Sequence, residues 1–401
     1  METAVAGILL DWLELFVRWT HVIAAICWIG SSFYFIALDA SLKAHPRLDV
    51  RVKGEAWQVH GGGFYQIQKF SVAPEFMPEQ LTWFKWEAYA TWMFGFALLV
   101  LVYYANASLY LIDPAVMAMA PERAVEIALA SLVLGWLGYN ALCRSKIGQD
   151  LKLLSIVGFV ALIAIAFVYS RLFSGRGAFI QVGALVGTIM AANVLMIIIP
   201  NQRKVVASLL AGEAPDPALG FIAKQRSLHN NYLTLPVLFT MLSNHYAFTY
   251  QSEWNWLVLA CVFVGSFLVR HWFNVHHTGA HPDWRLWPAA AVPFAAVIAL
   301  QLATRSSADL GPVSHVVTFA ELRDVVEARC HSCHAAKPSF AAFAEPPKGV
   351  MFDTEAQILA QAKQIYAQAV TARAMPLGNI THITEAERSV IALWFEAGAK
   401  R

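Results

Sequence analysis

Long apolar stretches alternate with short polar connections from Leu9 to Ala303, whereas the rest of the chain has the mixed pattern of a water-soluble domain. A helix needs about 20 mostly apolar residues to cross a bilayer. Eight stretches qualify: 12–38, 86–107, 123–143, 151–170, 178–200, 230–249, 254–273 and 285–303. The pattern predicts an all-α fold, with a polytopic transmembrane bundle over residues 1–303, a linker at 304–318 and a soluble domain at 319–401.

Composition supports a membrane protein and excludes some partners. Hydrophobic residues make up 58% of the chain and charged residues 14%, against about 45–50% and about 25% in ordinary soluble domains. The net charge is only +2, and the chain contains no long basic run. Nucleic acid is therefore not an expected partner, whereas membrane lipid is.

The distribution of Lys and Arg predicts the orientation of the spans. The connections after the odd-numbered spans carry fifteen of these residues, and the opposite set carries four. Because positive charge is retained on the cytoplasmic side, both termini are expected in the periplasm of a bacterium with an inner membrane. The first apolar run contains Asp11 and Glu14 and lacks a basic region before it, so we expect a span there rather than a cleaved signal peptide.

The soluble domain contains a C-x-x-C-H motif, from Cys330 to His334. This spacing places Cys330 and Cys333 on one helical turn, where they can bind the two vinyl groups of a haem c covalently, with His334 as the proximal iron ligand. A zinc knuckle or a redox dithiol is the competing interpretation. The absence of a second cysteine pair in the sequence weighs against zinc.

The residues around the motif are typical of a small class I cytochrome c. Residues 319–328 form an amphipathic helix leading into it, and Thr384 with Glu387 forms a capping box for a helix from Glu385 to Ala397. The sixth iron ligand is expected to be Met375, in the loop before that helix. Met351 and His382 are the alternatives.

Polar side chains within apolar spans are costly in lipid and often functional. His21 in the first span and His245 near the outer end of the sixth are expected at similar depths. Facing each other, they would ligate a non-covalent haem b that passes electrons to haem c. The alternative is that they hydrogen-bond to neighbouring helices or line a polar cavity.

The connection at 39–85 contains three consecutive glycines after His60, and Lys69, Lys85 and several aromatic residues follow. Such a combination would suit a flat, anionic heterocycle, because glycines let the backbone approach closely and aromatic rings stack. The alternative is a structured loop in which the glycines only form turns.

The whole chain resembles the bacterial membrane-bound urate oxidases (urate hydroxylases) that carry a fused C-terminal cytochrome c. The resemblance lies in the cytochrome tail and in Arg18–His21, Trp28–Phe33, His60–Tyr65, Leu81–Tyr89, His229–Tyr232 and Ser243–Tyr246. It implies oxidation of urate by water to 5-hydroxyisourate. The electrons would leave through the cytochrome to a soluble cytochrome c or a terminal oxidase.

For that reaction we expect His60 or His229 to act as the base, with Lys69, Lys85 or Arg226 balancing the charge of the substrate. Haem c accepts one electron at a time, which is a further reason to expect a second carrier such as haem b. The alternatives are a dehydrogenase acting on quinol or another small molecule, and a membrane cytochrome with no substrate of its own.

Overall fold

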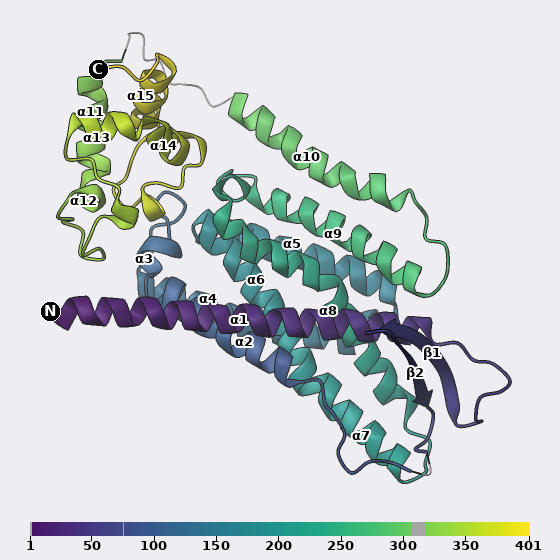
Figure 1. The fold of residues 1–401 in the computed structure, drawn as a ribbon. Coiled ribbons are helices and arrows are strands. Elements are labelled where there is room, and N and C mark those ends of the chain that lie inside the picture. Colours follow the sequence, from purple (N-terminus) through teal and green to yellow (C-terminus); the bar gives the residue numbers. More distant parts are fainter. Residues whose placement is uncertain (1, 75, 307–316) are drawn as a thin grey trace.

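The computed structural model describes residues 2–74, 76–306 and 317–401, and it is mostly helical (Figure 1). The helices of the N-terminal part are α1 (Glu2–Ser41), α2 (Trp86–Leu98), α3 (Ala107–Tyr110), α4 (Pro121–Arg144), α5 (Leu151–Leu172), α6 (Gly175–Ala192), α7 (Ile199–Leu210), α8 (Pro217–Leu242), α9 (Asn255–His277) and α10 (Leu286–Ser306). The C-terminal domain contains α11 (Phe319–Arg329), α12 (His331–His334), α13 (Glu355–Ala360), α14 (Ala362–Ile365) and α15 (Glu385–Glu396). The expected linker, 304–318, lies mostly outside the described residues.

Seven helical segments of the described chain are long and apolar enough to cross a membrane: 8–41, 86–104, 121–144, 151–172, 175–210, 255–277 and 286–303. They indicate a multi-pass membrane protein. The expected count of eight is corrected, because the predicted span at 230–249 falls on α8, which is not among the seven. This helix ends at Leu242, and polar residues such as Arg226, Asn230 and Asn231 are buried along it.

Although α8 is not strongly apolar, it lies inside the bundle and contacts α1, α6, α7 and α9. The N-terminus and the C-terminal domain lie at the same end of the bundle, and α7 lies at the other (Figure 1). Within the bundle, α8 is therefore a polar inner helix and not an eighth apolar span. Neighbouring helices, rather than lipid, surround its polar side chains.

One long helix of the bundle contains a widened turn. Residues 175–210 form a continuous helical segment, in which Asn193–Ile198 adopts π-helical hydrogen bonding between α6 and α7. Such turns insert one residue into a helix and often occur at functional sites. Asn193 stands at the start of the turn and is fully buried.

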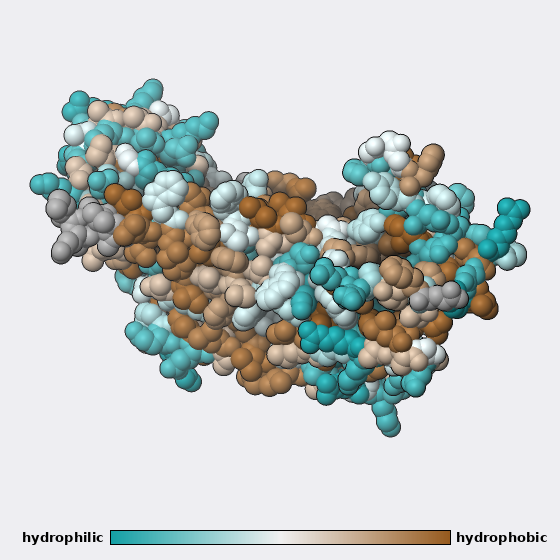
Figure 2. All heavy atoms as spheres, turned by 60° about the horizontal axis from the view of Figure 1, so that its bottom comes forward, coloured by the Kyte–Doolittle hydropathy of each residue, from teal (hydrophilic) through white to brown (hydrophobic). Residues whose placement is uncertain are grey.

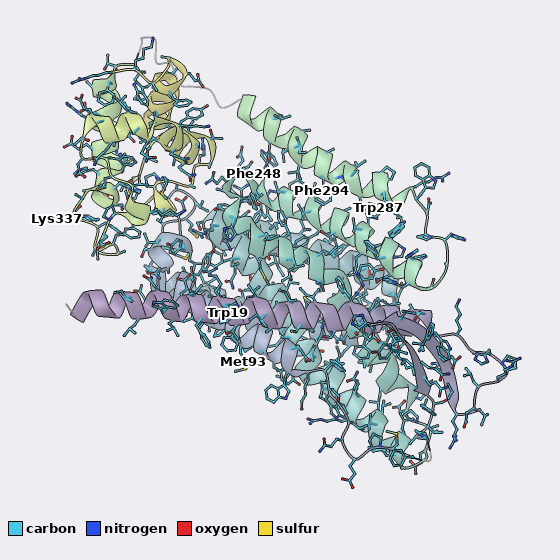
Figure 3. The ribbon with its side chains drawn as sticks, in the orientation of Figure 1. Trp19, Met93, Phe248, Trp287, Phe294 and Lys337 are labelled. Atoms are coloured by element: carbon cyan, nitrogen blue, oxygen red, sulfur yellow. The ribbon has the colours of Figure 1, made fainter. Side chains whose placement is uncertain are left out.

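The outer surface of the bundle is apolar. In Figure 2 hydrophobic side chains gather over the middle of the molecule, between more hydrophilic ends. Figure 3 shows Trp19 on α1, Met93 on α2 and Trp287 on α10, all of them large and exposed. Inside, the core contains fully buried residues of α6 and α9, among them Phe179, Leu185 and Phe263. Because the exposed apolar surface covers helices that can span a membrane, we assign it to lipid contact.

The all-α prediction is wrong for the connection after α1, which forms a two-stranded antiparallel sheet. Strand β1 (Val52–His60) pairs with β2 (Gly63–Phe70), with His60 opposite Gly63. Gly61 and Gly62 have φ angles of 59° and 78°, which side chains other than glycine rarely adopt. The glycines therefore form a tight hairpin turn, as in the alternative interpretation of this stretch.

Glu55 is the polar centre of the hairpin. Its carboxylate accepts hydrogen bonds from His45, Trp57, Gln66 and Gln68, at 2.9, 2.9, 2.6 and 3.3 Å. These bonds favour the ionised form and lower the pKa of Glu55 from 4.5 to about 2. The network ties both strands to the segment that follows α1.

The hairpin should therefore loosen in acid. A carboxyl group with a depressed folded-state pKa stabilises the fold above its ordinary pKa, and this contribution is lost as the pH falls from 4.5 towards about 2. Amide hydrogen exchange in β1 and β2, corrected for the intrinsic pH dependence, should show falling protection over this range. The Glu55→Gln variant should show no such change. Constant protection in the unmodified protein would contradict the prediction.

Candidate functional site

The C-x-x-C-H motif occupies a single turn at the end of α11. Cys330 caps that helix, and the backbone N–H groups of Cys333 and His334 both donate to the Cys330 carbonyl, at 3.2 and 3.0 Å. The Nδ1 atom of His334 lies 2.9 Å from the Val350 carbonyl oxygen. A histidine that donates from Nδ1 has Nε2 available for a metal, and its ring is held in place. The three side chains therefore fit the attachment and proximal ligation of haem c.

The packing around this turn supports the same assignment. Helices α11 and α15 lie against each other, with the rings of Phe319 and Trp394 6.1 Å apart and Arg329 paired with Glu387 at 2.9 Å. The capping box expected at Thr384 and Glu387 is present, which confirms the start of the last helix. The two helices expected beside the haem are thus both formed.

Neither alternative use of the cysteines finds support. Burial, with Cys333 close by, raises the pKa of the Cys330 thiol to about 12, whereas the attacking thiol of a redox C-x-x-C motif has a lowered pKa. Within the described residues, no group of three or more His, Cys, Asp and Glu side chains could hold a metal ion. A zinc site would need such a group.

The expected sixth ligand, Met375, lies in the loop before α15. Its carbonyl accepts a hydrogen bond from Arg388 at 3.1 Å, and its N–H donates to the Gln368 carbonyl at 3.1 Å. The alternative Met351 is flanked by two residues in contact with the proximal histidine: Val350 accepts from His334, and the N–H of Phe352 donates to the His334 carbonyl. The residues on both sides of Met351 are therefore bonded to the histidine expected as the proximal ligand, and Met375 stays our prediction for the sixth ligand.

Two of the five residues predicted for catalysis, Arg226 and His229, share one buried cluster on α8. Arg226 is only 1% exposed, and its guanidinium donates to Asn140 at 2.9 Å and covers the Tyr139 ring at 4.8 Å. The Tyr139 hydroxyl lies 2.7 Å from Nδ1 of His229 and accepts from Asn193 at 3.1 Å. Sequence reasoning missed the partners on α4 and in the π-helical turn, because nothing local indicates contacts across three helices.

The other three predicted catalytic residues lie elsewhere. His60 is exposed beside the hairpin turn, and Lys69 is exposed on β2 and paired with Asp39 at 2.7 Å. Lys85 precedes α2, with its ammonium 5.7 Å from the centre of the Trp86 ring. The described contacts therefore do not join His60, Lys69 and Lys85 to the cluster of Arg226 and His229.

The histidines expected to hold haem b have different neighbours. Nδ1 of His21 lies 2.9 Å from the Thr91 carbonyl of α2. A side chain at Gly95 would reach within 2.7 Å of its ring, so this histidine fills the α1–α2 contact. His245 is exposed in a short turn after α8. The haem b pairing stays a prediction, and the contact of His21 with Thr91 fits the alternative, in which a histidine bonds to an adjacent helix.

The C-terminal domain meets the bundle at α3. A Cβ atom at Gly378 would lie 2.9 Å from the Ser108 carbonyl oxygen and 3.0 Å from that of Leu109. Nearby, burial raises the pKa of Asp113, while the positive charge of Arg388 and the neighbouring His382 oppose the increase. The loop that contains Met375 and Gly378 thus packs against the bundle.

A comparison with protein-family profiles found a match to the N-terminal part of the chain. No curated protein and no solved structure matches the chain significantly. The profile of the family described as urate oxidase N-terminal matches residues 7–302, which cover the bundle and the hairpin. The match ends before the C-x-x-C-H motif, so it carries no information about the C-terminal domain. Because it covers well over half of the sequence, the chain belongs to the urate oxidase N-terminal family.

Proposed function

We propose that this protein oxidises urate to 5-hydroxyisourate and passes the electrons out through a haem c in its C-terminal domain. The family match over residues 7–302 is the observation that supports urate as the substrate. The conversion of urate and water into 5-hydroxyisourate releases two electrons and two protons, and oxygen is not needed as the oxidant. Haem c, when bound, supplies a one-electron acceptor. The two electrons of each urate would therefore leave in two one-electron steps, with haem c reoxidised between them or with the haem c of a second molecule taking the other electron.

The C-terminal domain supports this electron outlet through its own residues. Cys330 and Cys333 would hold the haem, His334 and Met375 would ligate the iron, and the Val350 carbonyl would orient His334. The charge distribution supports a periplasmic position for this domain, with the bundle in the inner membrane. A soluble cytochrome c or a terminal oxidase could then collect the electrons.

The bundle supplies charge for an anionic substrate. Urate is an anion near neutral pH, and loss of a further proton makes it easier to oxidise. Within the described residues, neither Arg226 of α8 nor Arg270 of α9 has a carboxylate partner, so buried positive charge is available in the bundle to stabilise an anion. His229 lies one turn further along the same helix, in contact with Tyr139, and remains our candidate for the base.

Anaerobic urate should reduce the c-type haem of the purified protein. We expect the visible c-band to appear on addition of urate, with formation of 5-hydroxyisourate and no hydrogen peroxide, because the haem rather than oxygen takes the electrons. The measurement is an absorption spectrum in detergent under nitrogen, combined with assays of both products. A spectrum that responds to a quinol but not to urate would instead favour a respiratory dehydrogenase.

A further inference from the structure

A second buried arginine lies on the opposite side of α8 from Arg226. Arg270 of α9 is 4% exposed, and its Nε donates to Oδ1 of Asn231 at 2.9 Å. Nδ2 of Asn274 donates to the same oxygen at 2.9 Å. The guanidinium carbon lies 3.7 Å from the centre of the Phe33 ring of α1. Three helices thus meet around one acceptor atom.

Each polar residue of this group has a buried atom without a partner: Nη2 of Arg270, Nδ2 of Asn231 and Oδ1 of Asn274. The three atoms belong to side chains bonded to the same oxygen, so they lie close together. Unpartnered buried polar groups are rare, and each costs about 1–3 kcal/mol. Within the described part of the chain, no carboxylate pairs with Arg270 either. The group has the donors, the acceptor and the charge of a site for an anion.

The cluster around Arg226 differs in this respect. Its guanidinium donates to Asn140 and, at 3.5 Å, to Asn193, and only its Nε lacks a partner. Asn193 uses its own amide to bond Tyr139 and Asn230. The Arg226 cluster is therefore largely satisfied by the protein, whereas the Arg270 cluster leaves two donors and one acceptor for a ligand.

We propose that Arg270, Asn231 and Asn274 form the recognition site for the urate anion, an assignment that rests on the function proposed above. Urate has carbonyl oxygens for the donors on Arg270 and Asn231, and ring N–H groups for the acceptor on Asn274. Phe33 holds the guanidinium against its ring by a cation–π contact. The site lies seven residues before the end of α9, about 10 Å along the helix, on the side that the charge count assigns to the cytoplasm.

The test measures urate binding without turnover. Protein reduced beforehand with dithionite cannot take electrons from urate, so a urate-dependent rise in melting temperature reports binding alone. We expect Arg270→Gln to raise the urate concentration for half-maximal stabilisation by about 10- to 100-fold, the range for losing a hydrogen bond to a charged group. Asn274→Leu removes the unpartnered oxygen together with the amide that donates to Asn231 and leaves the charge in place. It should weaken binding in the same direction.

Two arginine variants make the result specific. Arg171→Gln is the matched control, because Arg171 also lies over a phenylalanine ring, at 5.2 Å. Arg171 is exposed near the other end of the bundle, so this variant should leave urate binding unchanged. Arg226→Gln removes the same charge from the other side of α8. A large loss of binding in Arg226→Gln, with none in Arg270→Gln, would overturn the assignment.

The outcomes also separate the site from the proposed function. If urate reduces the unmodified protein but Arg270→Gln and Asn274→Leu bind urate as it does, the function stands and the site is wrong, with water alone filling it. If urate neither stabilises nor reduces the unmodified protein, the proposed function itself fails. Dithionite should reduce every variant fully, which shows that the haem domain is intact.

Discussion

A chain in which Cys330 and Cys333 are both replaced by alanine is expected to carry no covalently bound haem and to pass no electrons from urate to an external acceptor. Both thiols lie on one turn with His334, and the Nδ1 of that histidine is already bonded to the Val350 carbonyl. Without the thioether bonds, His334 alone would hold the haem on this side. Haem staining after denaturing electrophoresis measures attachment, and anaerobic reduction by urate measures electron transfer.

The matched control replaces two cysteines of the bundle, Cys27 and Cys261, with alanine. Neither forms a disulfide, and small substitutions in apolar helices remove little packing. This control should retain both the covalent haem and the response to urate. Covalent haem that persists in the Cys330 and Cys333 double variant would show that the motif is not the attachment site, and the C-terminal domain would need another role.

The pattern of apolar residues predicted most of the helices because lipid imposes a length on each of them. The expected spans 151–170 and 254–273 correspond to α5 (Leu151–Leu172) and α9 (Asn255–His277). The capping box predicted the start of α15 because its contacts are local: Thr384 and Glu387 satisfy backbone groups only a few residues away. Predictions that depend on residues close in sequence were therefore the accurate ones.

The hairpin agrees with one of the two interpretations of the glycine stretch, a structured loop in which the glycines form turns. The run from Val52 to Phe70 is rich in β-branched and aromatic residues on both sides of a Gly-Gly pair, which is a hairpin signal. The polar centre at Glu55 is harder to foresee, since its partners come from both strands and from His45 before them. A long connection between membrane spans is not necessarily a flexible loop.

The buried arginines show where single-sequence reasoning stops. Arg226, His229 and Asn230 recur at the spacing of one helix face, so their proximity could be inferred. Arg270 bonds to Asn231, 39 residues earlier in the chain, and no local pattern links two such positions. Only the packing of α8 against α9 brings them together. That packing makes Arg270, one of the fifteen basic residues counted for the orientation of the spans, a candidate ligand group.

Replacement of Gly378 by alanine is expected to slow electron transfer from the bundle to the C-terminal domain without removing the haem. Gly378 has a φ of 56°, and an added Cβ would meet the carbonyl oxygens of Ser108, Leu109 and Ile112 at 2.9, 3.0 and 3.2 Å. These are backbone atoms, so the two parts of the protein must separate. A misplacement of about 1 Å can cost about 100-fold in rate, and we expect reduction by urate to slow about 10- to 100-fold.

Gly349→Ala is the control that isolates docking from backbone strain. Gly349 lies in the same domain with a φ of 68°, but nothing lies within 4 Å of its added Cβ. This variant therefore has the backbone strain of alanine at positive φ but no clash with α3. Stopped-flow reduction by urate should be slow only in Gly378→Ala, whereas a small reductant that reaches the haem directly should act equally fast on both variants. Equal urate kinetics in the two variants would mean that electrons do not depend on the contact between α3 and the Gly378 loop, and that they enter the C-terminal domain elsewhere.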